Sequence, residues 1–511
     1  MFKRLLSVGG FTLLSRLFGF VQNIIMAAIL GDGLLSDAYF VALRLPNSFR
    51  GIFAEGAFNV AFIPRYSALR MREGDVAAND FADGVFSWQM AAQIVLLVAA
   101  LLLMPQIVAV MAPGFAQHSG QVALAIQLSR IAFPYLILTV VAVQLSAMLN
   151  ANDKFAAAAA WSVFLNLAVI GTLLASRWFT NAAYAASWGV LIAGVLQLFF
   201  IVWAAESAGL SLRLAWPRWS VQMKEFLLAL GAATLGSASV QIGLVIDTVI
   251  ASFLPLGVLT AISYADRINQ LPLGTLGIAL ATVLLPEMSR RVAMNDRAGA
   301  DAAQNNAAAL GLFLTLPFAA AFLLIPQTIM RALFAHGAFS VAAADISASA
   351  LAAYGVGLPA FVMVRVVAAS FYSRGDTATP VRAMILAVLV NVGLKFLLVM
   401  GLHLGAVGVA LGTSLGSWTN VSLLLFLARR RDLLRIESHL TRALPAIALA
   451  AVATGAAALG GVWLTETYAH IHRFHNEALL AAALLCGGSA YGLVALVFRR
   501  VLPLGRLGGR G

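Results

Sequence analysis

Five charged side chains stand in an apolar stretch long enough to cross a membrane twice. They are Arg16 in the apolar run 8–30 and Asp37, Arg44, Arg50 and Glu55 in the apolar run 34–62. A charge in hydrocarbon costs about 2.5–3.5 kcal/mol on insertion scales, so these side chains must face protein or water. Guanidinium groups bind phosphate or carboxylate through two parallel hydrogen bonds. The arginines therefore suggest an anionic substrate bound at membrane depth.

The elements that must position these charges are transmembrane helices. Of the 511 residues, 61% are hydrophobic and 11% are charged, whereas an ordinary globular domain is about half apolar and a quarter charged. We identify about fourteen apolar runs, among them 34–62 and 225–254, that are long enough to cross a bilayer as a helix. The sequence therefore predicts an all-α polytopic membrane protein without a soluble domain between its helices.

The basic charge balance indicates membrane topology and not nucleic-acid binding. The formal net charge is +12, but most Lys and Arg residues fall on alternate loops and on the termini. This pattern predicts that both termini are cytoplasmic. Arginine clusters such as Arg429–Arg431 are expected to contact anionic lipid headgroups, with no nucleic-acid partner. The single cysteine, Cys486, excludes a disulfide within the chain.

An internal repeat divides the chain into two lobes. Tyr39 and Pro46 match Tyr264 and Pro272, and further matches keep an offset of about 222–226 residues, as in two parallel-topology repeats. The further matches are 62–64 with 284–286, and Pro134 with Pro359. We predict an N-terminal lobe at 1–220, a C-terminal lobe at 221–435, and two more helices with a basic tail at 436–511. A central cavity between such lobes is typical of alternating access.

More charges within the apolar runs support this picture. They are Arg130, Asp247, Asp266, Arg267, Arg365 and Lys395. Each cation could simply neutralise a carboxylate, but the cations outnumber the carboxylates, and the surplus favours a bound anion. Pro46 and Pro272 predict a break or kink at equivalent positions. The proline sites are either structural bends or hinges that line the cavity.

Several motifs resemble the MviN/MurJ family of lipid II flippases. The longest is Leu45-Pro46-Asn47-Ser48-Phe49-Arg50-Gly51-Ile52-Phe53-Ala54-Glu55-Gly56-Ala57-Phe58, and shorter ones are 15–20, 112–115, 264–267 and 371–376. The resemblance implies an exporter fold with fourteen helices in two lobes. It also implies transport of undecaprenyl-pyrophosphate-linked disaccharide pentapeptide to the periplasmic leaflet of the bacterial inner membrane, for peptidoglycan synthesis. We expect no cofactor and no metal, and a monomer.

The resemblance also assigns roles to individual residues. Arg16, Arg50 and Arg267 match the cavity arginines of the family and would hold the pyrophosphate. Asp37 and Glu55 match acidic positions that would orient those arginines or form gating contacts.

One position departs from the family pattern. Gln22 stands where many relatives carry a further arginine, so Arg44 or Arg365 would have to compensate as substrate ligands. Asp266, Pro46 and Pro272 are the other candidates for gating or orienting roles.

A separate group of residues could couple transport to an energy source. Asp247 and Lys395 are both predicted in the second lobe and would neutralise one another if placed together. Asn391 lies one helical turn before Lys395, on the same face. Some relatives are thought to hold sodium in this lobe. The amine of Lys395 would occupy the place of that cation, so we predict a transporter that does not need sodium.

Other functions fit the sequence less well. A glycosyltransferase acting on polyprenyl phosphate would need a catalytic carboxylate in a large loop, and no motif here supports enzyme activity. A drug or cation exporter would favour an acidic or aromatic cavity. The main alternative is an exporter of another polyprenyl-linked saccharide or of a small molecule on the same fold. A pure scaffold fits least well, because a scaffold would gain nothing from charges at membrane depth.

Overall fold

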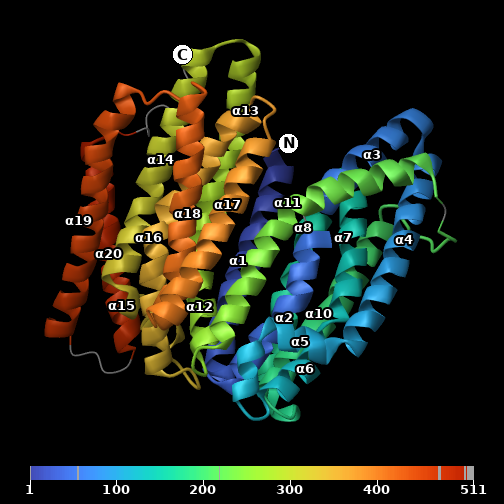
Figure 1. Ribbon diagram of the computed structural model, residues 1–511, viewed down its shortest axis with the longest axis horizontal. Coiled ribbons are helices and arrows are strands. Elements are labelled where there is room, and N and C mark those ends of the chain that lie inside the picture. The colour runs from blue at the N-terminus through green and yellow to red at the C-terminus, as the bar shows by residue number, and fades with distance from the viewer. Residues whose placement is uncertain (1, 54–56, 218, 470–473, 500–501, 503–511) are drawn as a thin grey trace. The chain divides into compact units, whose positions relative to one another are not determined.

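Every regular element in the described part of the chain is a helix (Figure 1). The computed structural model describes residues 2–53, 57–217, 219–469, 474–499 and 502, and these residues form no strand. The predicted all-α fold is therefore confirmed.

The helices form two compact units, Met1–Gly257 with Gly337–Phe339, and Val258–His336 with Ser340–Gly511. The helices of the first unit are α1 (Phe2–Leu30), α2 (Leu34–Phe53), α3 (Ala57–Glu73), α4 (Asp75–Leu102), α5 (Met104–Met111), α6 (Gln121–Ala132), α7 (Tyr135–Ala151), α8 (Phe155–Ala160), α9 (Val163–Leu174), α10 (Ala182–Glu206) and α11 (Val221–Ser252). Those of the second unit are α12 (Val258–Pro272), α13 (Ile278–Ala293), α14 (Arg297–Leu324), α15 (Pro326–Phe334), α16 (Val341–Tyr372), α17 (Ala378–Phe396), α18 (Gly405–Arg430), α19 (Ser438–Tyr468) and α20 (His475–Val497).

Twelve helical segments among the described residues are long and apolar enough to cross a membrane. Two of the predicted runs are not among these twelve. In 34–62, α2 carries Asp37, Arg44 and Arg50. In 225–254, α11 is a helix of 32 residues, of which Gln241–Ser252 counts as a shorter apolar segment among the described residues. The predicted count of about fourteen is roughly consistent with the structure. The charged side chains that mark the first run as functional also lower its mean hydropathy.

The order and packing of the helices repeat along the chain. The helix pairs α3–α4, α5–α6 and α9–α10 pack together in the first half, and α13–α14, α15–α16 and α17–α18 do so in the second. The repeat differs locally, because Pro134 separates α6 from α7 whereas Pro359 lies inside α16. Since α11 begins the second repeat but groups with the first unit, the lobe boundary at residue 220 stays a prediction.

Helix α11 packs against α2 and α3. Phe226 of α11 contacts Phe58 and Phe62 of α3 edge to face, with ring centroids 5.9 and 6.4 Å apart. Phe81 of α4 stacks on Phe62 at 5.6 Å. Each such aromatic pair contributes roughly 0.5–1.5 kcal/mol beyond its buried area. Phe58, which ends the longest family-like motif, therefore serves helix packing.

In the second unit, α16 packs on α18, and α19 and α20 run side by side. The α19–α20 pair is the red pair in Figure 1. It is attached through α14, where Phe313 stacks on Tyr491 of α20 at 4.7 Å and packs against Ile447 of α19. The two appended helices predicted at 436–511 therefore have a packed interface with the rest of their unit.

Ion pairs link three helix connections of the second unit to one another, namely α13–α14, α16–α17 and α18–α19. Arg297 lies 2.5 Å from Asp432, and Arg431 donates to Asp376 at 2.7 Å. Hydrogen bonds from Thr379, with a further one from Arg431, hold the pKa of Asp376 below its ordinary value. A hydrogen bond from Arg297 likewise lowers the pKa of Asp432. These carboxylates are therefore more stable as anions in the folded protein than in the unfolded chain.

The two lowered pKa values predict acid sensitivity. Their contribution to stability is present above the unfolded pKa, about 3.9, and is lost as the pH falls through the folded pKa values. We expect the melting temperature in detergent to fall below about pH 4. The variant Asp376→Asn should show a smaller fall over the same range. Equal pH profiles for both proteins would contradict a role of Asp376 in this loss.

Candidate functional site

Two charges of α2 bind the segment that contains α11. A carboxylate oxygen of Asp37 accepts a hydrogen bond from the backbone N–H of Gly257 at 2.7 Å, and Asp37 is only 2% exposed. Nε of Arg44 donates to the hydroxyl of Thr248 on α11 at 3.1 Å. Both bonds help to hold α11 against α2. Any contact of Arg44 with substrate would use its terminal nitrogens, and a gating role of Asp37 stays a prediction.

The last turns of α2 lie close to α11. A Cβ atom on Gly51 would lie 2.6 Å from Nε2 of Gln241, so a larger residue there would require the flexible Gln241 side chain to move. Helix α2 continues through Pro46 to Phe53, so it is not broken there among the described residues, and the alternative of a kink at Pro46 stays a prediction. Next to Pro46, Leu45 and Ser48 line an apolar cavity of about 490 Å³ between α2, α5 and α11.

Arg16 and Arg50 are both half-buried in the first unit. Asn166 of α9 donates to the backbone carbonyl of Ser15 at 2.9 Å, and Gly19 faces the same side chain. Since successive helical residues are about 100° apart, Arg16 lies on a face next to the one that contacts α9. Glu55 lies outside the described residues.

Helix α12 exposes Arg267 and buries Tyr264. Tyr264 is fully buried and stacks on Phe334 of α15, with ring centroids 4.8 Å apart. Arg267 is exposed, and Asp266 accepts a hydrogen bond from Gln270 one turn further on. The packing of Tyr264 therefore fixes the rotation of α12 that leaves Arg267 accessible to a ligand.

The structure brings Arg365 to the place where α12 ends. Pro272 is the last residue of α12, and a π-helical turn, Leu273–Gly277, leads into α13. Removing a backbone N–H favours such an irregular turn. A Cβ atom on Gly277 would lie 2.7 Å from a terminal nitrogen of Arg365, so this guanidinium packs against the irregular turn between α12 and α13. The sequence predicted an interruption at Pro272, but it gave no sign of Gly277 or of the proximity of Arg365.

Lys395 is buried in a row of glycines on α18. It is 1% exposed, and a Cβ atom on Gly412 would lie 2.4 Å from its Cγ. Asn391 lies over Gly416 in the same way, so the two side chains share one face, as predicted. Glycines four residues apart allow two helix backbones to approach closely. The spacing of Gly408, Gly412 and Gly416 was a signal in the sequence that pointed to this contact.

Asp247 and Lys395 belong to different compact units. Asp247 lies on α11, which groups with the first unit, whereas Lys395 lies on α17 of the second. Helix α11 groups with the first unit because it makes its main contacts with α2 and α3. The predicted placement of both residues in one lobe stays a prediction, as does the lobe boundary at residue 220. Their direct pairing stays a prediction.

The described site residues are suited to binding an anion. Each unit presents arginines on helices of its transmembrane region, Arg16, Arg44 and Arg50 in the first and Arg267 and Arg365 in the second. The described residues contain no cluster of three or more His, Cys, Asp or Glu side chains that could hold a metal ion. Guanidinium groups remain charged at any physiological pH and can bind phosphate groups in pairs.

Comparisons with known proteins agree on one family. Residues 26–487 match the family model described as lipid II flippase MurJ. The chain is 37% identical over 500 residues to the probable lipid II flippase MurJ of Rhizobium tropici, which covers 97% of this chain and 92% of that protein. It is 40% identical over 498 residues to the corresponding protein of Rhizobium meliloti (strain 1021), with 96% and 92% covered.

Solved structures show the same fold. The chain superposes on a lipid II flippase MurJ in an inward closed conformation with a TM-score of 0.79 and 24% identity, over 97% of this chain and 99% of that one. An inward-facing multidrug transporter of the MATE family, from the MOP superfamily, gives a TM-score of 0.68 with 18% identity, over 82% and 94%.

Proposed function

Because this chain belongs to the lipid II flippase MurJ family, whose members are transporters and not enzymes, we propose that it flips lipid II across the bacterial inner membrane. The direction would be from the cytoplasmic to the periplasmic leaflet, in support of peptidoglycan synthesis. The observation that carries this proposal is the family match, which spans residues 26–487 and so includes most of both units.

Transport would proceed by alternating access between two states of the units. The support is the fold, which is shared with MATE transporters described as inward-facing and outward-facing. Two compact units with repeated helix order suit such a mechanism, since each can move as a body. We further propose that both termini are cytoplasmic, in keeping with the distribution of Lys and Arg, and that one copy suffices.

The pyrophosphate of the substrate would be held by Arg16, Arg50 and Arg267. The half-buried positions of the first two and the exposed face of α12 that carries Arg267 support this assignment. Arg365 would add a fourth guanidinium, and its position at the irregular turn after Pro272 makes it sensitive to any bending of α12–α13. Charge-assisted contacts of this kind are about twice as strong as neutral hydrogen bonds.

The proposed function is tested by depleting the protein in its host and measuring which leaflet holds lipid II. We expect lipid II to accumulate on the cytoplasmic side, as protection from a reagent that reaches only the periplasmic face. Restored expression should reverse the change. An unchanged leaflet distribution after depletion would contradict the proposal.

The variant Gln22→Arg is expected to support normal growth. It restores the arginine that many relatives carry, on a half-buried position of α1 six residues after Arg16. The added guanidinium would join the proposed pyrophosphate site, so complementation and lipid II flipping should match wild type. Loss of function would show that the cavity of this protein is organised differently.

We propose that Lys395, with Asp247 and Asn391, biases the two states without sodium. Lys395→Met should then impair transport and leave the melting temperature nearly unchanged, and the added change Asp247→Asn should not restore transport. If the residues form only a structural pair, Lys395→Met should cost about 3–5 kcal/mol of stability and the double variant should recover it. Transport and thermal unfolding of the single and double variants separate the two cases. Sodium-stimulated transport by the wild type would contradict both.

A further inference from the structure

A pair of hydrogen bonds holds the connection between α10 and α11 against α4 in the first unit. A carboxylate oxygen of Asp83 accepts from the backbone N–H of Arg213 at 2.8 Å. One turn further along α4, the hydroxyl oxygen of Ser87 accepts from the backbone N–H of Ala215 at 2.9 Å. The donors lie in residues 210–217, which form no helix or strand. We call these residues the first strap, and the two bonds the first clamp.

The second unit repeats this clamp on α14. A carboxylate oxygen of Asp301 accepts from the N–H of Arg435 at 3.3 Å, and the amide oxygen of Asn305 accepts from the N–H of Glu437 at 3.2 Å. The donors belong to residues 431–437 between α18 and α19, which we call the second strap. Asp301 and Asn305 follow their counterparts on α4 by 218 residues, and the strap donors follow theirs by 222. The clamp is therefore part of the internal repeat.

The spacing of the bonded groups explains why both clamps have the same pattern. Two acceptors that are four residues apart on a helix are separated by about 6 Å along its axis. Two N–H groups that are two residues apart in an extended chain are separated by about 6.6 Å. An extended strap beside a helix can therefore satisfy two of its backbone N–H groups at once.

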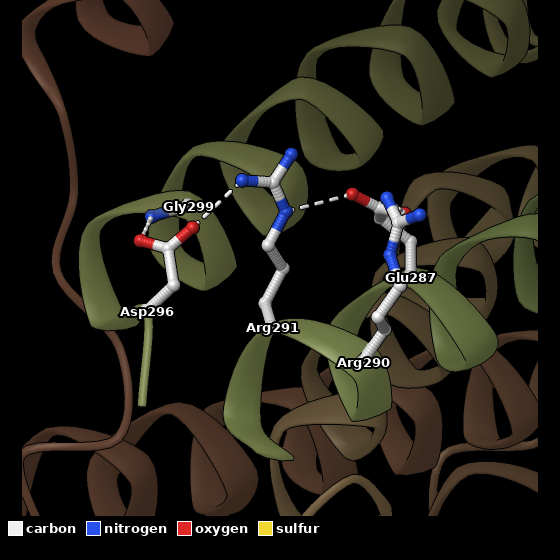
Figure 2. Close-up of polar contacts among 5 residues, drawn as sticks. All are labelled: Glu287, Arg290, Arg291, Asp296 and Gly299. Carbon is white, nitrogen blue, oxygen red and sulfur yellow. Dashed lines mark hydrogen bonds and ion pairs between the residues drawn. The ribbon is translucent and has the colours of Figure 1, made fainter. Parts of the chain in front are cut away.

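The helix that carries the second clamp is itself fixed at its beginning (Figure 2). A carboxylate oxygen of Asp296 accepts from the backbone N–H of Gly299 in the first turn of α14 at 2.8 Å. Arg291 of α13 donates to the other oxygen of Asp296 at 2.7 Å and to Glu287 at 2.8 Å. In Figure 2 the guanidinium of Arg291 lies between the two carboxylates. The second strap is thus held by a helix whose own start is positioned by α13.

The first strap leads into α11, and contacts with α4 continue beyond the strap. Trp219 packs edge to face on Trp88 of α4, with ring centroids 5.7 Å apart. A Cβ atom on Gly84 would lie 3.7 Å from the terminal methyl of Met223 in the first turn of α11. The first clamp therefore fastens the beginning of α11 to α4.

The opposite end of α11 is fastened to the same unit. The hydroxyl oxygen of Ser252 accepts from the backbone N–H of Gly114 at 3.1 Å, and Gly257 donates to Asp37 at 2.7 Å. Between these ends α11 packs on α2, α3, α4 and α5, which all belong to the first unit. Helix α19, which follows the second strap, packs in the same way on α14 of the second unit.

We propose that α11 moves with the first unit during transport, and that Asp83 and Ser87 are the positioning residues that fasten its beginning. This inference rests on the proposed function, because it assumes two bodies that alternate between two states. The sequence repeat alone would assign α11 to the second body, since that helix begins the second repeat. The clamp assigns α11 to the first body, and the second clamp gives α19 the same relation to the second body.

Hydrogen–deuterium exchange of the purified full-length protein tests the clamp itself. We expect the amides of residues 210–217 to exchange about tenfold faster in the double variant Asp83→Ala, Ser87→Ala, because both acceptors are lost. Asp80→Ala is the matched control, because Asp80 is an exposed aspartate of α4 without a hydrogen bond to the strap among the described residues. Equal exchange of the strap in the double variant and the wild type would overturn the proposal.

A reversible crosslink tests whether α11 moves with the first unit. In a Cys486→Ala background, Trp88→Cys and Trp219→Cys are joined by a short, reducible bis-methanethiosulfonate reagent, and lipid II flipping is measured in vesicles. We expect the same flipping rate before and after reduction of the crosslink. The pair Gly84→Cys and Met223→Cys joins α4 to α11 directly and keeps the tryptophan contact intact.

The outcomes of the crosslinking experiment separate this inference from the proposed function. Loss of flipping in the crosslinked protein that is restored by the reductant would overturn the inference and leave the proposed function standing. A wild type that does not flip lipid II would overturn both.

Rescue by the crosslink shows whether Asp83 and Ser87 act by positioning α11. The double variant Asp83→Ala, Ser87→Ala should flip lipid II several-fold more slowly than the wild type, and Asp80→Ala should flip it at the wild-type rate. Crosslinking α4 to α11 in the double variant should restore the rate, because a covalent link replaces the lost hydrogen bonds. Unchanged flipping in the double variant, or no recovery on crosslinking, would contradict the positioning role.

Discussion

Alanine in place of Arg16, Arg50 or Arg267 is expected to abolish complementation of a strain that lacks its own flippase. Each change removes a charge-assisted contact to a pyrophosphate at membrane depth, and a charged substrate left without its partner is not stabilised by hydrocarbon. The level of each variant in the membrane should equal that of the wild type. Growth and the leaflet distribution of lipid II are the measurements.

Two comparisons sharpen this experiment. Lysine at the same positions should restore function only in part, because an ammonium cannot form the two parallel bonds of a guanidinium. Arg177→Ala serves as the matched control, since Arg177 lies in a short connection outside the long helices and packs over Trp178. Normal growth of all three alanine variants would show that the arginines do not bind the substrate.

Valine in place of Gly412 is expected to destabilise the second unit strongly. The Cβ atom would lie 2.4 Å from Cγ of Lys395 and 3.3 Å from its backbone nitrogen, so α17 would have to move away from α18. Overpacking alone costs about 1–3 kcal/mol. We expect little protein in the membrane and a much lower melting temperature.

The control for this variant is Gly393→Val on α17. A Cβ atom there meets nothing within 4 Å, so the change should be tolerated. Adding Lys395→Ala to Gly412→Val should recover part of the stability, because it removes the atom that clashes most closely. No difference between Gly412→Val and Gly393→Val would contradict the close packing of α17 on α18.

Features that depend on one helix were predictable from the sequence. Hydrophobic length gave the all-α fold, and spacing along one helix placed Asn391 and Lys395 on a common face, which their contacts with α18 confirm. The interruption after Pro272 followed from the missing backbone N–H. Pro46 has the same chemistry, but α2 continues through it. The difference lies in the surroundings of the two helices and not in proline itself.

Features that depend on which helices meet were not predictable. The hydrogen bond from Gly257 to Asp37 joins residues that are 220 positions apart in the chain. No pattern within one helix could therefore predict it. The same holds for the grouping of α11 with the first unit, which puts Asp247 and Lys395 in different compact units. Arg365 lies over Gly277 only because α16 packs on the α12–α13 turn. The role of the arginines toward the substrate rests on the family and stays a prediction.

The buried lysine has a consequence for biogenesis. When α17 leaves the ribosome, Lys395 would oppose its entry into the lipid by about 2.5–3.5 kcal/mol. The row of glycines that covers this side chain belongs to α18, which is synthesised later and follows the π-helical turn Leu397–Gly401 and the short connection 402–404. Helix α17 is therefore expected to wait in the translocon and to enter the bilayer together with α18, as a helical hairpin.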